Sequence, residues 1–327
     1  MQNVLVTGIT GSGGSYLAEY ILENHQNVNV CGLHRWHSAT TLNNIASFKN
    51  KVNIFECDLV DLSSIIRALD KIKPLRIFHL AAYANVRKCF ETPLAVIYNN
   101  IMGTANLLEA VRLVCPDAIV QICSSSEVYG NPLNFPMTED HPLKPVNPYS
   151  ASKLAQESIA FAYYKSWGLH VIITRMFAYI NPRRRDLFAT SFAYQIAEIE
   201  AGKREVLTHG NLESIRTIID VRDAMETYWI ASECCDFGDP YNIGGKYTAS
   251  VGEILDVLIS RSRVKIKTVQ DSKLLRPVDV TKQVPDTKKF DSVSNWRPRY
   301  SIEESLDFLL DHCRDEIRKN EGQNCRD

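Results

Sequence analysis

The amino terminus constrains the fold of this chain more than any other stretch. Asn3-Val4-Leu5-Val6-Thr7 is a short apolar run that predicts a strand, and a glycine-rich turn follows it, Gly8-Ile9-Thr10-Gly11-Ser12-Gly13-Gly14. Ser15 to Glu23 then has the pattern of a helix. A strand, a tight glycine turn and a helix in this order place a pyrophosphate on helix amide groups, because glycine lets the ligand approach the backbone closely. The sequence therefore predicts a dinucleotide site near the start of the chain.

Apolar segments alternate with helical ones through the first half of the chain. Residues 93–114 and 149–167 have helical periodicity, whereas several shorter segments have the apolar character of buried strands. These segments are Val28–Leu33, Val52–Cys57, Arg76–Ala81, Ala118–Cys123 and His170–Arg175. Strand–helix alternation predicts an α/β fold with a Rossmann-type, doubly wound parallel sheet.

The pattern changes after Arg175. Pro182 and an arginine cluster are followed by a predicted helix over Phe188–Ala201 and then by shorter strands and helices. We expect this region to be a smaller, interwoven α/β part that binds the substrate. In this division residues 1–175 form the cofactor-binding domain, with 217–246 returning to it, and residues 176–216 and 247–327 form the substrate-binding part.

Bulk properties exclude several classes of function. The chain has 327 residues and 45% hydrophobic content, which is ample for a core, and its formal net charge of -1 provides no broad basic field. We therefore expect no nucleic acid and no acidic membrane as a partner. No apolar run reaches the length of a membrane span and no leader precedes the first strand, so a cytoplasmic protein is expected. The nine cysteines lack zinc-type spacing and are expected to be reduced thiols.

Two neighbouring motifs carry the candidate chemistry. Ser125 and Glu127 follow the predicted strand that ends at Cys123, and Tyr149 and Lys153 lie four residues apart in a predicted helix. Residues with this spacing share one face of a helix, so the Lys153 ammonium group favours the ionised form of the Tyr149 phenol. A phenolate near neutral pH is a general base. Taken alone, a Tyr-x-x-x-Lys pair is also compatible with surface packing, and Glu127 with a carboxylate that caps the next turn.

The segment after the second predicted strand bears on the choice of dinucleotide. It reads Gly32-Leu33-His34-Arg35-Trp36-His37-Ser38. The NAD-binding form of this fold has an acidic residue here that accepts hydrogen bonds from the adenosine ribose. No carboxylate is present in this segment, and the guanidinium fork of Arg35 suits a 2′-phosphate. We therefore favour NADP over NAD, the alternative being that Arg35 points into solvent. His34 and His37 have no third ligand nearby, so no metal site is expected.

These motifs together resemble the extended short-chain dehydrogenases/reductases that modify nucleotide sugars, over almost the full length of the chain. Within them the chain is similar to the GDP-mannose 4,6-dehydratase branch. The stretches that carry this similarity are Gly8-Ile9-Thr10-Gly11, Gly14-Ser15-Tyr16-Leu17-Ala18-Glu19, Ser126-Glu127-Val128-Tyr129-Gly130, Pro182-Arg183-Arg184 and Gly210-Asn211-Leu212-Glu213. GDP-4-keto-6-deoxymannose reductases share the segments Gln195 to Gly202, Asp220-Val221-Arg222-Asp223 and Leu274-Leu275-Arg276-Pro277. The patterns Arg35-Trp36 and Pro182-Arg183-Arg184-x-Asp186 are similar to those of GDP-N-acetylglucosamine 4,6-dehydratases.

The resemblance implies a role for each candidate residue. Tyr149 is the general base at the sugar O4, Lys153 its electrostatic partner, and Ser125 the hydroxyl that hydrogen-bonds to O4. Glu127 is the acid/base group at C5 and C6, which simple ketone reduction does not need, although some ketoreductases of the superfamily also carry Glu there. The implied cofactor-binding residues are Gly8, Thr10, Gly11, Gly14, Arg35, Asp58, Leu59, Leu80, Ala81 and Ala82, with Tyr149 and Lys153. The implied substrate-binding residues are Asn181, Arg184, Asn211, Arg216 and Arg276.

The resemblance also implies a GDP-sugar substrate and a homodimer or homotetramer, and the expected cofactor is NADP on the argument from Arg35. The expected reaction is an internal redox cycle that converts a GDP-hexose to its 4-keto-6-deoxy form, with GDP-mannose favoured and GDP-N-acetylglucosamine as the other candidate. The sequence departs from the dehydratase pattern at Ser125, where Thr is usual, and at Ala178 and Tyr179, where Asn and His are usual. An NADPH-dependent GDP-4-keto-6-deoxymannose reductase and a non-catalytic nucleotide-binding scaffold protein are the alternatives.

Overall fold

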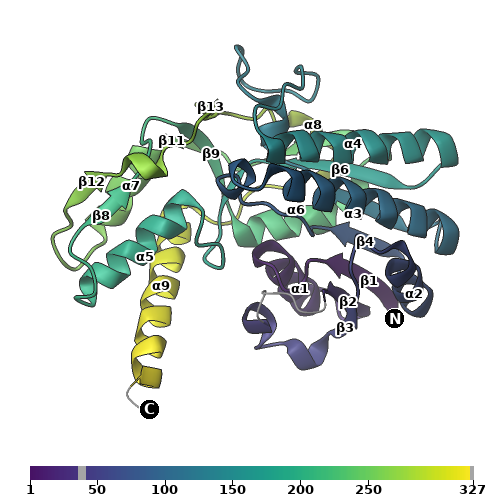
Figure 1. Cartoon of the computed structure of the whole chain (residues 1–327), viewed down its shortest axis with the longest axis horizontal. Helices are drawn as coiled ribbons and strands as arrows, with labels where there is room; N and C mark the ends of the chain where they lie inside the picture. Colours follow the sequence, from purple (N-terminus) through teal and green to yellow (C-terminus); the bar gives the residue numbers. More distant parts are fainter. Residues whose placement is uncertain (36–41, 325–327) are drawn as a thin grey trace. The chain divides into compact units, whose positions relative to one another are not determined.

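The computed structural model of the chain describes residues 1–35 and 42–324, with side chains as far as Lys319. The described residues form two compact units (Figure 1). Unit 1 comprises Met1–Met176, Ala224–Ile243 and Pro285–Arg297, and unit 2 comprises Phe177–Asp223, Gly244–Val284 and the described part of Pro298–Asp327.

A parallel sheet of seven strands, in the order β10-β6-β5-β4-β1-β2-β3, forms the centre of unit 1. The strands are β1 (Gln2–Thr7), β2 (Val28–His34), β3 (Asn53–Glu56), β4 (Arg76–His79), β5 (Ile119–Cys123), β6 (Val171–Met176) and β10 (Pro240–Ile243). The accompanying α-helices are α1 (Ser12–Asn24), α2 (Leu62–Ile72), α3 (Pro93–Val114), α4 (Pro148–Trp167), α6 (Val221–Cys234) and α8 (Lys288–Ser294). The order of β1 to β6 is that of a doubly wound dinucleotide-binding sheet. The predicted α/β fold with a Rossmann-type sheet is confirmed.

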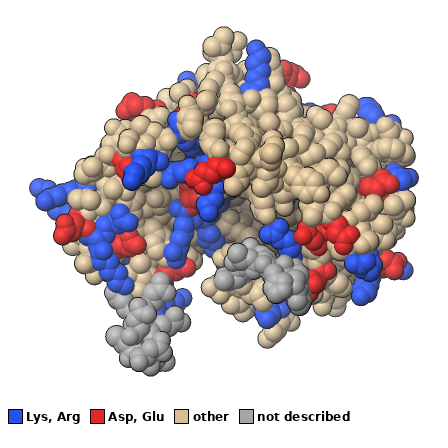
Figure 2. All heavy atoms as spheres, in the orientation of Figure 1, with Lys and Arg blue, Asp and Glu red and all other residues tan. Residues whose placement is uncertain are grey.

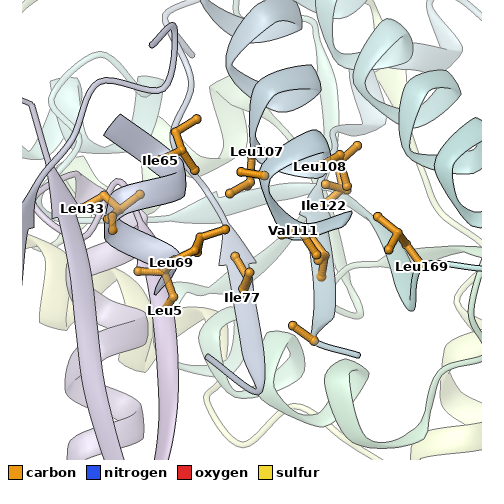
Figure 3. Packing of buried hydrophobic residues seen from close by; sticks show 14 of the residues in the cluster. Leu5, Leu33, Ile65, Leu69, Ile77, Leu107, Leu108, Val111, Ile122 and Leu169 are labelled. Atoms are coloured by element: carbon orange, nitrogen blue, oxygen red, sulfur yellow. The ribbon is translucent and has the colours of Figure 1, made fainter. Parts of the chain in front are cut away.

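One row of the sheet shows how apolar sequence builds the core of unit 1. The register places Leu5 of β1 opposite Cys31 of β2 and Ile77 of β4, and Ile77 opposite Val120 of β5. All of these side chains are buried, and residues of α2 and α3, including Leu69, point toward them (Figure 3). Burying one such aliphatic side chain stabilises the fold by about 1.5–3 kcal/mol. Strands with both faces covered need nearly continuous apolar sequence, which is why the predicted strands stand out as apolar runs.

Helix α4 has well-defined signals at both ends. Asn147 is its N-cap, and its side chain accepts a hydrogen bond from Ser150 N, while the Ser150 hydroxyl accepts one from Asn147 N. Pro148 occupies the first turn, and Gly168 ends the helix in the left-handed conformation, with φ of 69°. These signals fix the start of the helix, and with it the position of Tyr149 in the first turn.

Unit 2 is smaller and is built from short strands and three longer helices. Its strands are β7 (Ala178–Ile180), β8 (Leu207–His209), β9 (Ile215–Asp220), β11 (Tyr247–Ser250), β12 (Thr268–Gln270) and β13 (Lys282–Gln283), and its helices are α5 (Phe188–Glu200), α7 (Val251–Ser260) and α9 (Ile302–Asn324). Strand β9 pairs with β11 in antiparallel fashion and with β7 and β13 in parallel, whereas β8 and β12 form a separate two-stranded sheet. Apolar side chains of α5, α7 and α9 pack into one core.

Short 3₁₀ helices lie in the connections: η1 (Leu42–Ile45), η2 (Lys49–Lys51), η3 (Lys88–Phe90), η4 (Ser126–Tyr129) and η5 (Ser272–Leu274). Basic and acidic side chains are interspersed over the face seen in Figure 2. None of the helices in the described ranges is both long and apolar enough to span a bilayer.

Candidate active site

The turn between β1 and α1 requires glycine at specific positions. Gly8 has a φ of +70°, and a Cβ atom there would lie 3.0 Å from backbone atoms of Ala81. A Cβ atom on Gly14 would lie 2.2 Å from the carbonyl oxygen of Gly8, far inside van der Waals contact. Gly11 is the N-cap of α1 and has no side chain that could cap this helix end. With Thr10 buried in the turn, the amide groups at the start of α1 suit a phosphate ligand.

The other candidates for cofactor binding lie at the carboxyl ends of neighbouring strands. They are Asp58 and Leu59, which follow β3, and Leu80, Ala81 and Ala82, which follow β4. Asp58 Oδ1 accepts a hydrogen bond from Val60 N at 3.1 Å, and the Thr7 hydroxyl accepts one from Ala81 N at 3.1 Å. Because the carboxyl ends of parallel strands meet at one edge, the order β4-β1-β2-β3 brings these residues to the edge that carries the glycine turn.

Arg35 directly follows β2 and has an exposed side chain. Its Nη1 donates a hydrogen bond to the Tyr83 hydroxyl at 3.0 Å, and its guanidinium carbon lies 5.8 Å from the centroid of the Tyr83 ring. Tyr83 follows β4, so the guanidinium group is held at the same edge of the sheet as the glycine turn. Residues 36–38 of this segment lie outside the described residues.

Ser125 and Glu127 lie on the short segment after β5. Ser125 is the N-cap of η4, and its hydroxyl oxygen accepts a hydrogen bond from Glu127 N at 3.2 Å. Glu127 is half-buried, and its Oε2 accepts a hydrogen bond from Asn147 Nδ2 at 3.1 Å. The cap of this turn is therefore the Ser125 hydroxyl, and the Glu127 carboxylate is directed to the amino-terminal end of α4.

Tyr149 and Lys153 lie one turn apart on α4, as their spacing predicts. Both side chains are buried, and Lys153 Nζ lies 6.0 Å from the centroid of the Tyr149 ring. Lys153 Nζ also donates a hydrogen bond to the carbonyl oxygen of Cys123 at 2.7 Å. This bond and the one between Asn147 and Glu127 join α4 to the end of β5. The structure thus brings Ser125, Glu127, Tyr149 and Lys153 together in unit 1.

A buried histidine, His79, ends β4 beside this group. Its Nδ1 and Nε2 atoms form hydrogen bonds with the hydroxyl groups of Thr7, at 2.9 Å, and Thr104, at 2.8 Å. Burial lowers the pKa of His79 to about 3, and the positive charge of Lys153 lowers it as well. The imidazole is therefore neutral at physiological pH and adds no positive charge next to Lys153.

Three of the substrate-binding candidates meet at one carboxylate in unit 2. Arg216 Nη2 lies 3.8 Å and Arg276 Nη1 lies 3.6 Å from Asp279 Oδ1. Asp279 Oδ2 accepts hydrogen bonds from Asn211 Nδ2 at 3.1 Å and from the Ser214 hydroxyl at 2.9 Å. One acidic residue thus holds two guanidinium groups close together, in an arrangement that suits a diphosphate.

The remaining two substrate-binding candidates lie in the loop between β7 and α5. Asn181 is buried, and its Oδ1 accepts a hydrogen bond from Arg183 N at 2.9 Å. Its carbonyl oxygen accepts one from the Thr190 hydroxyl at 2.9 Å. Arg184 Nε lies 3.2 Å from Asp186 Oδ1. These two side-chain contacts, to Arg183 N and to Asp186, lie within the loop itself.

Sequence analysis did not single out Asn147 or Asp279, which contact candidate residues directly. Asn147-Pro148 is typical of a helix amino terminus. That pattern does not predict the contact of the Asn147 side chain with Glu127, twenty positions away. Asp279 lies three residues after Arg276 in a segment without helical structure, and its position beside Arg216 depends on tertiary structure.

Known proteins are similar to this chain over nearly its whole length. The family model described as GDP-mannose 4,6 dehydratase matches residues 5–308. GDP-mannose 4,6 dehydratase 1 of Arabidopsis thaliana is 31% identical over 94% of this chain and 88% of its own length. GDP-6-deoxy-D-mannose reductase of Pseudomonas aeruginosa is 26% identical over 97% of this chain and 99% of its own length. GDP-mannose 4,6-dehydratase sdnI of Sordaria araneosa is 27% identical over 94% of this chain, which spans only 60% of that longer protein.

A solved structure shares the fold over nearly the whole chain. The structure of RMD from Pseudomonas aeruginosa complexed with NADPH has a TM-score of 0.82 and 25% identity, and covers 97% of this chain and 100% of that chain. The family match extends over parts of both units and includes all the candidate residues from Gly8 to Arg276. This chain therefore belongs to the GDP-mannose 4,6-dehydratase family.

Proposed function

We propose that this chain is a GDP-sugar 4,6-dehydratase, which converts a GDP-hexose to its 4-keto-6-deoxy form. The position of Glu127 is the observation that carries this proposal. Its carboxylate lies on the same short segment as Ser125 and is directed to the helix that bears Tyr149 and Lys153. Oxidation at C4 needs only a base at O4, whereas loss of water also needs a group that moves a proton at C5 and C6.

The site residues divide this chemistry between them. Tyr149 takes the proton from O4, while the Lys153 charge stabilises the phenolate and Ser125 hydrogen-bonds to the same oxygen. The ketone at C4 makes the C5 proton acidic, and Glu127 takes that proton and donates one to the hydroxyl that leaves C6. The bound nicotinamide supplies the hydride acceptor and donor for this cycle. A buried site suits such a sequence because the ketone is kept from solvent.

The cofactor is proposed to be NADP, bound by unit 1. The fit rests on the turn between β1 and α1, where Gly14 leaves no room for a side chain, and on the start of α1, whose N-cap residue Gly11 has no side chain. Arg35 supplies an exposed guanidinium group at the same edge of the sheet, suited to a 2′-phosphate. The solved structure of RMD contains NADPH, whereas other solved neighbours contain NAD, so the choice of NADP rests on Arg35.

The GDP-sugar is proposed to be bound through unit 2, with its diphosphate on Arg216 and Arg276. Asp279 offsets the mutual repulsion of these two guanidinium groups and holds them in place until the ligand arrives. GDP-mannose is the favoured hexose and GDP-N-acetylglucosamine the second candidate. Arg184 and Asn181 are proposed to shape the loop beside the sugar.

One assay tests this function. Purified protein is incubated with NADP and either GDP-mannose or GDP-N-acetylglucosamine, and the mass of the product is measured by mass spectrometry. We expect a product lighter by one water, without net formation of reduced cofactor. No lighter product with either sugar, combined with stoichiometric NADPH oxidation on a GDP-4-keto-6-deoxy sugar, would show the chain to be a ketoreductase.

That reductase is the second candidate function, because a GDP-6-deoxy-D-mannose reductase matches the chain over nearly its full length. It would use the same Tyr149 and Lys153 pair and consume NADPH. A non-catalytic scaffold would show neither reaction while still binding the dinucleotide.

The assembly is proposed to be a homodimer or homotetramer. Helix α3 exposes Leu94, Tyr98 and Met102 at intervals of four residues, with relative exposures of 79%, 59% and 38%. A stripe of large apolar side chains on one helical face is typical of a surface that packs against another chain. Sedimentation should show a species of at least twice the 37.0 kDa chain mass, and a Tyr98→Glu variant should be smaller.

A further inference from the structure

A buried polar network lies next to the segment that carries Ser125 and Glu127. Glu157 of α4 and Arg175 of β6 form an ion pair in which both side chains are only 5% exposed. Arg175 Nη2 and Nε lie 2.8 and 3.2 Å from Glu157 Oε2, and Nε also lies 3.1 Å from Oε1. The pair is therefore multiply hydrogen-bonded and almost free of solvent.

The network contacts this segment at both of its ends. The Ser124 hydroxyl, immediately before Ser125, donates a hydrogen bond to Glu157 Oε1. At the other end, Arg175 Nη1 donates a hydrogen bond to the Tyr129 hydroxyl at 2.9 Å. The same Nη1 also donates to the carbonyl oxygen of Glu139 at 2.9 Å.

Tyr129 connects the network to strand β10. Its hydroxyl donates a hydrogen bond to Asn242 Oδ1 at 2.7 Å, and its ring lies against the Arg175 guanidinium, 5.0 Å from centroid to carbon. Burial raises the pKa of Tyr129 to about 12, so this hydroxyl keeps its proton and remains a donor. Residues 125–128 thus lie between Ser124 and Tyr129, both of which are hydrogen-bonded to the ion pair.

The carboxylate in this network shares a helix with the proposed catalytic base. Tyr149, Lys153 and Glu157 follow one another at intervals of four residues along α4 and so lie on one face. Lys153 holds the carbonyl oxygen of Cys123, and Glu157 holds the hydroxyl of Ser124. The helix that positions Tyr149 therefore also positions the chain that enters the segment of Ser125 and Glu127.

Stability alone does not account for such a pair. Desolvation of two charges offsets most of their attraction, and well-packed apolar residues of similar size stabilise a core as well or better. An ion pair does provide directional hydrogen bonds that an apolar pair lacks. Here those bonds join the pair to Ser124 and Tyr129, which flank the segment that carries Ser125 and Glu127.

We propose that Glu157 and Arg175 are positioning residues, which hold Ser125 and Glu127 in a fixed place relative to Tyr149. Neither residue is proposed to touch the substrate. The assignment rests on the proposed function for its catalytic consequence, but its structural part, the tethering of residues 125–129, is independent of which reaction the chain performs.

The test compares two variants that remove the same charge from similar, largely buried ion pairs in different units. Glu157→Gln keeps the shape of the side chain and removes its charge. Glu200→Gln in unit 2 is the matched control, because Glu200 forms a similar pair with Arg314, at 2.8 Å from each carboxylate oxygen, and both side chains are largely buried, 8% and 13% exposed. Tyr129→Phe is a milder third variant, which removes one hydroxyl of the network and keeps the ring.

Two measurements separate positioning from folding. Amide hydrogen exchange of peptides that contain residues 125–129 should become at least about tenfold faster in Glu157→Gln and in Tyr129→Phe, and unchanged in Glu200→Gln. In the dehydration assay, kcat should fall by about 10-fold to 100-fold in the first two variants at constant KM, with the control close to the unmodified protein.

The possible results are distinct. Unchanged exchange of residues 125–129 in Tyr129→Phe and Glu157→Gln would overturn the proposal, as would an equal loss of kcat in Glu200→Gln. If Glu157→Gln does not fold, Tyr129→Phe decides the question. If the unmodified protein shows no dehydration while the exchange result holds, the proposed function has failed and the tethering stands.

Discussion

At the scale of single residues, the candidate side chains differ in what holds them. Glu127 receives a hydrogen bond from Asn147, and Arg35 donates one to Tyr83 but remains exposed. These contacts suggest separate tasks, proton transfer for Glu127 and recognition of the cofactor for Arg35. Each task has its own measurable signature.

Replacing Arg35 by Ala should weaken NADP binding far more than NAD binding. A hydrogen bond to a charged group contributes about 1.5–3 kcal/mol, so the Kd for NADP should rise by about 10-fold to 100-fold while that for NAD changes little. Titration of both dinucleotides by calorimetry measures this. Arg67→Ala, at an exposed arginine on α2 with a 3.9 Å pair to Asp61, is the control for loss of surface charge. Equal weakening of both dinucleotides would show that Arg35 does not contact the 2′-phosphate.

Tyr149→Phe and Glu127→Gln should stop the reaction at different points. Loss of a positioned acid/base group costs about 10²–10⁴-fold in rate. Without the Tyr149 hydroxyl, C4 is not oxidised and no reduced cofactor forms. With Glu127→Gln, C4 oxidation continues, so reduced cofactor should accumulate on the enzyme during a single turnover, visible by its absorbance. Near-normal dehydration by Glu127→Gln would assign the carboxylate a structural role and favour the ketoreductase.

At the scale of elements, the start of α4 combines two roles in one side chain. Asn147 Oδ1 caps the helix through Ser150 N, while its Nδ2 donates to Glu127. The strand β5 and the helix α4 are thus joined at the point where both carry candidate residues. Different substitutions of Asn147 can distinguish its role as a helix cap from its hydrogen bond to Glu127.

Asn147→Ala and Asn147→Asp should differ in how their cost depends on pH. The Ala variant loses both the cap and the hydrogen bond to Glu127, and loss of the cap alone should lower the free energy of unfolding by about 1 kcal/mol at every pH. The Asp variant keeps a capping oxygen but places a second carboxylate beside Glu127, which raises the pKa of at least one of the two. Its destabilisation should therefore be small at acidic pH and grow as pH rises, as the carboxyl groups lose their protons. Denaturant unfolding between pH 4 and pH 8 tests this, and a pH-independent loss in both variants would contradict it.

At the scale of the whole molecule, acid stability should depend on His79. Its folded pKa, lowered to about 3 by burial first and by Lys153 second, lies below the value of 6.5 for an exposed histidine. Between these values the unfolded chain binds the additional proton. Stability from a neutral His79 is therefore fully present above pH 6.5 and is lost as pH falls toward 3.

Replacing His79 by Gln should make the free energy of unfolding depend less on pH in the acidic range. Gln keeps a hydrogen-bonding side chain but has no titrating ring. Below pH 6 the unmodified protein should lose about 1.4 kcal/mol more per pH unit than the variant, so their unfolding free energies converge on acidification. Denaturant titrations at several pH values give this difference. A constant difference from pH 7 to pH 4 would show that another group carries the acid response.

Local sequence was sufficient for the architecture of unit 1 and for the pairing of Tyr149 with Lys153. Strands and helices are encoded by patterns that extend over a few neighbouring residues, and i, i+4 spacing fixes a shared helical face wherever the helix lies. The same holds for the glycine turn, because the left-handed φ of Gly8 and the close approach at Gly14 are properties of one short segment. The predicted helix 93–114 has the same ends as α3 for this reason.

Tertiary structure alone decided which distant residues share a site. The contact of Asn147 with Glu127, the clamp of Glu157 and Arg175 on Ser124 and Tyr129, and the meeting of Arg216 with Asp279 join residues many positions apart. The grouping of residues 285–297 with unit 1 is of the same kind. Such contacts follow from how sheets and helices pack, and packing depends on the fit of whole surfaces, which no local pattern records. Local sequence patterns are therefore enough to identify the helices, the strands and the family, whereas packing sets how the reactive groups are held.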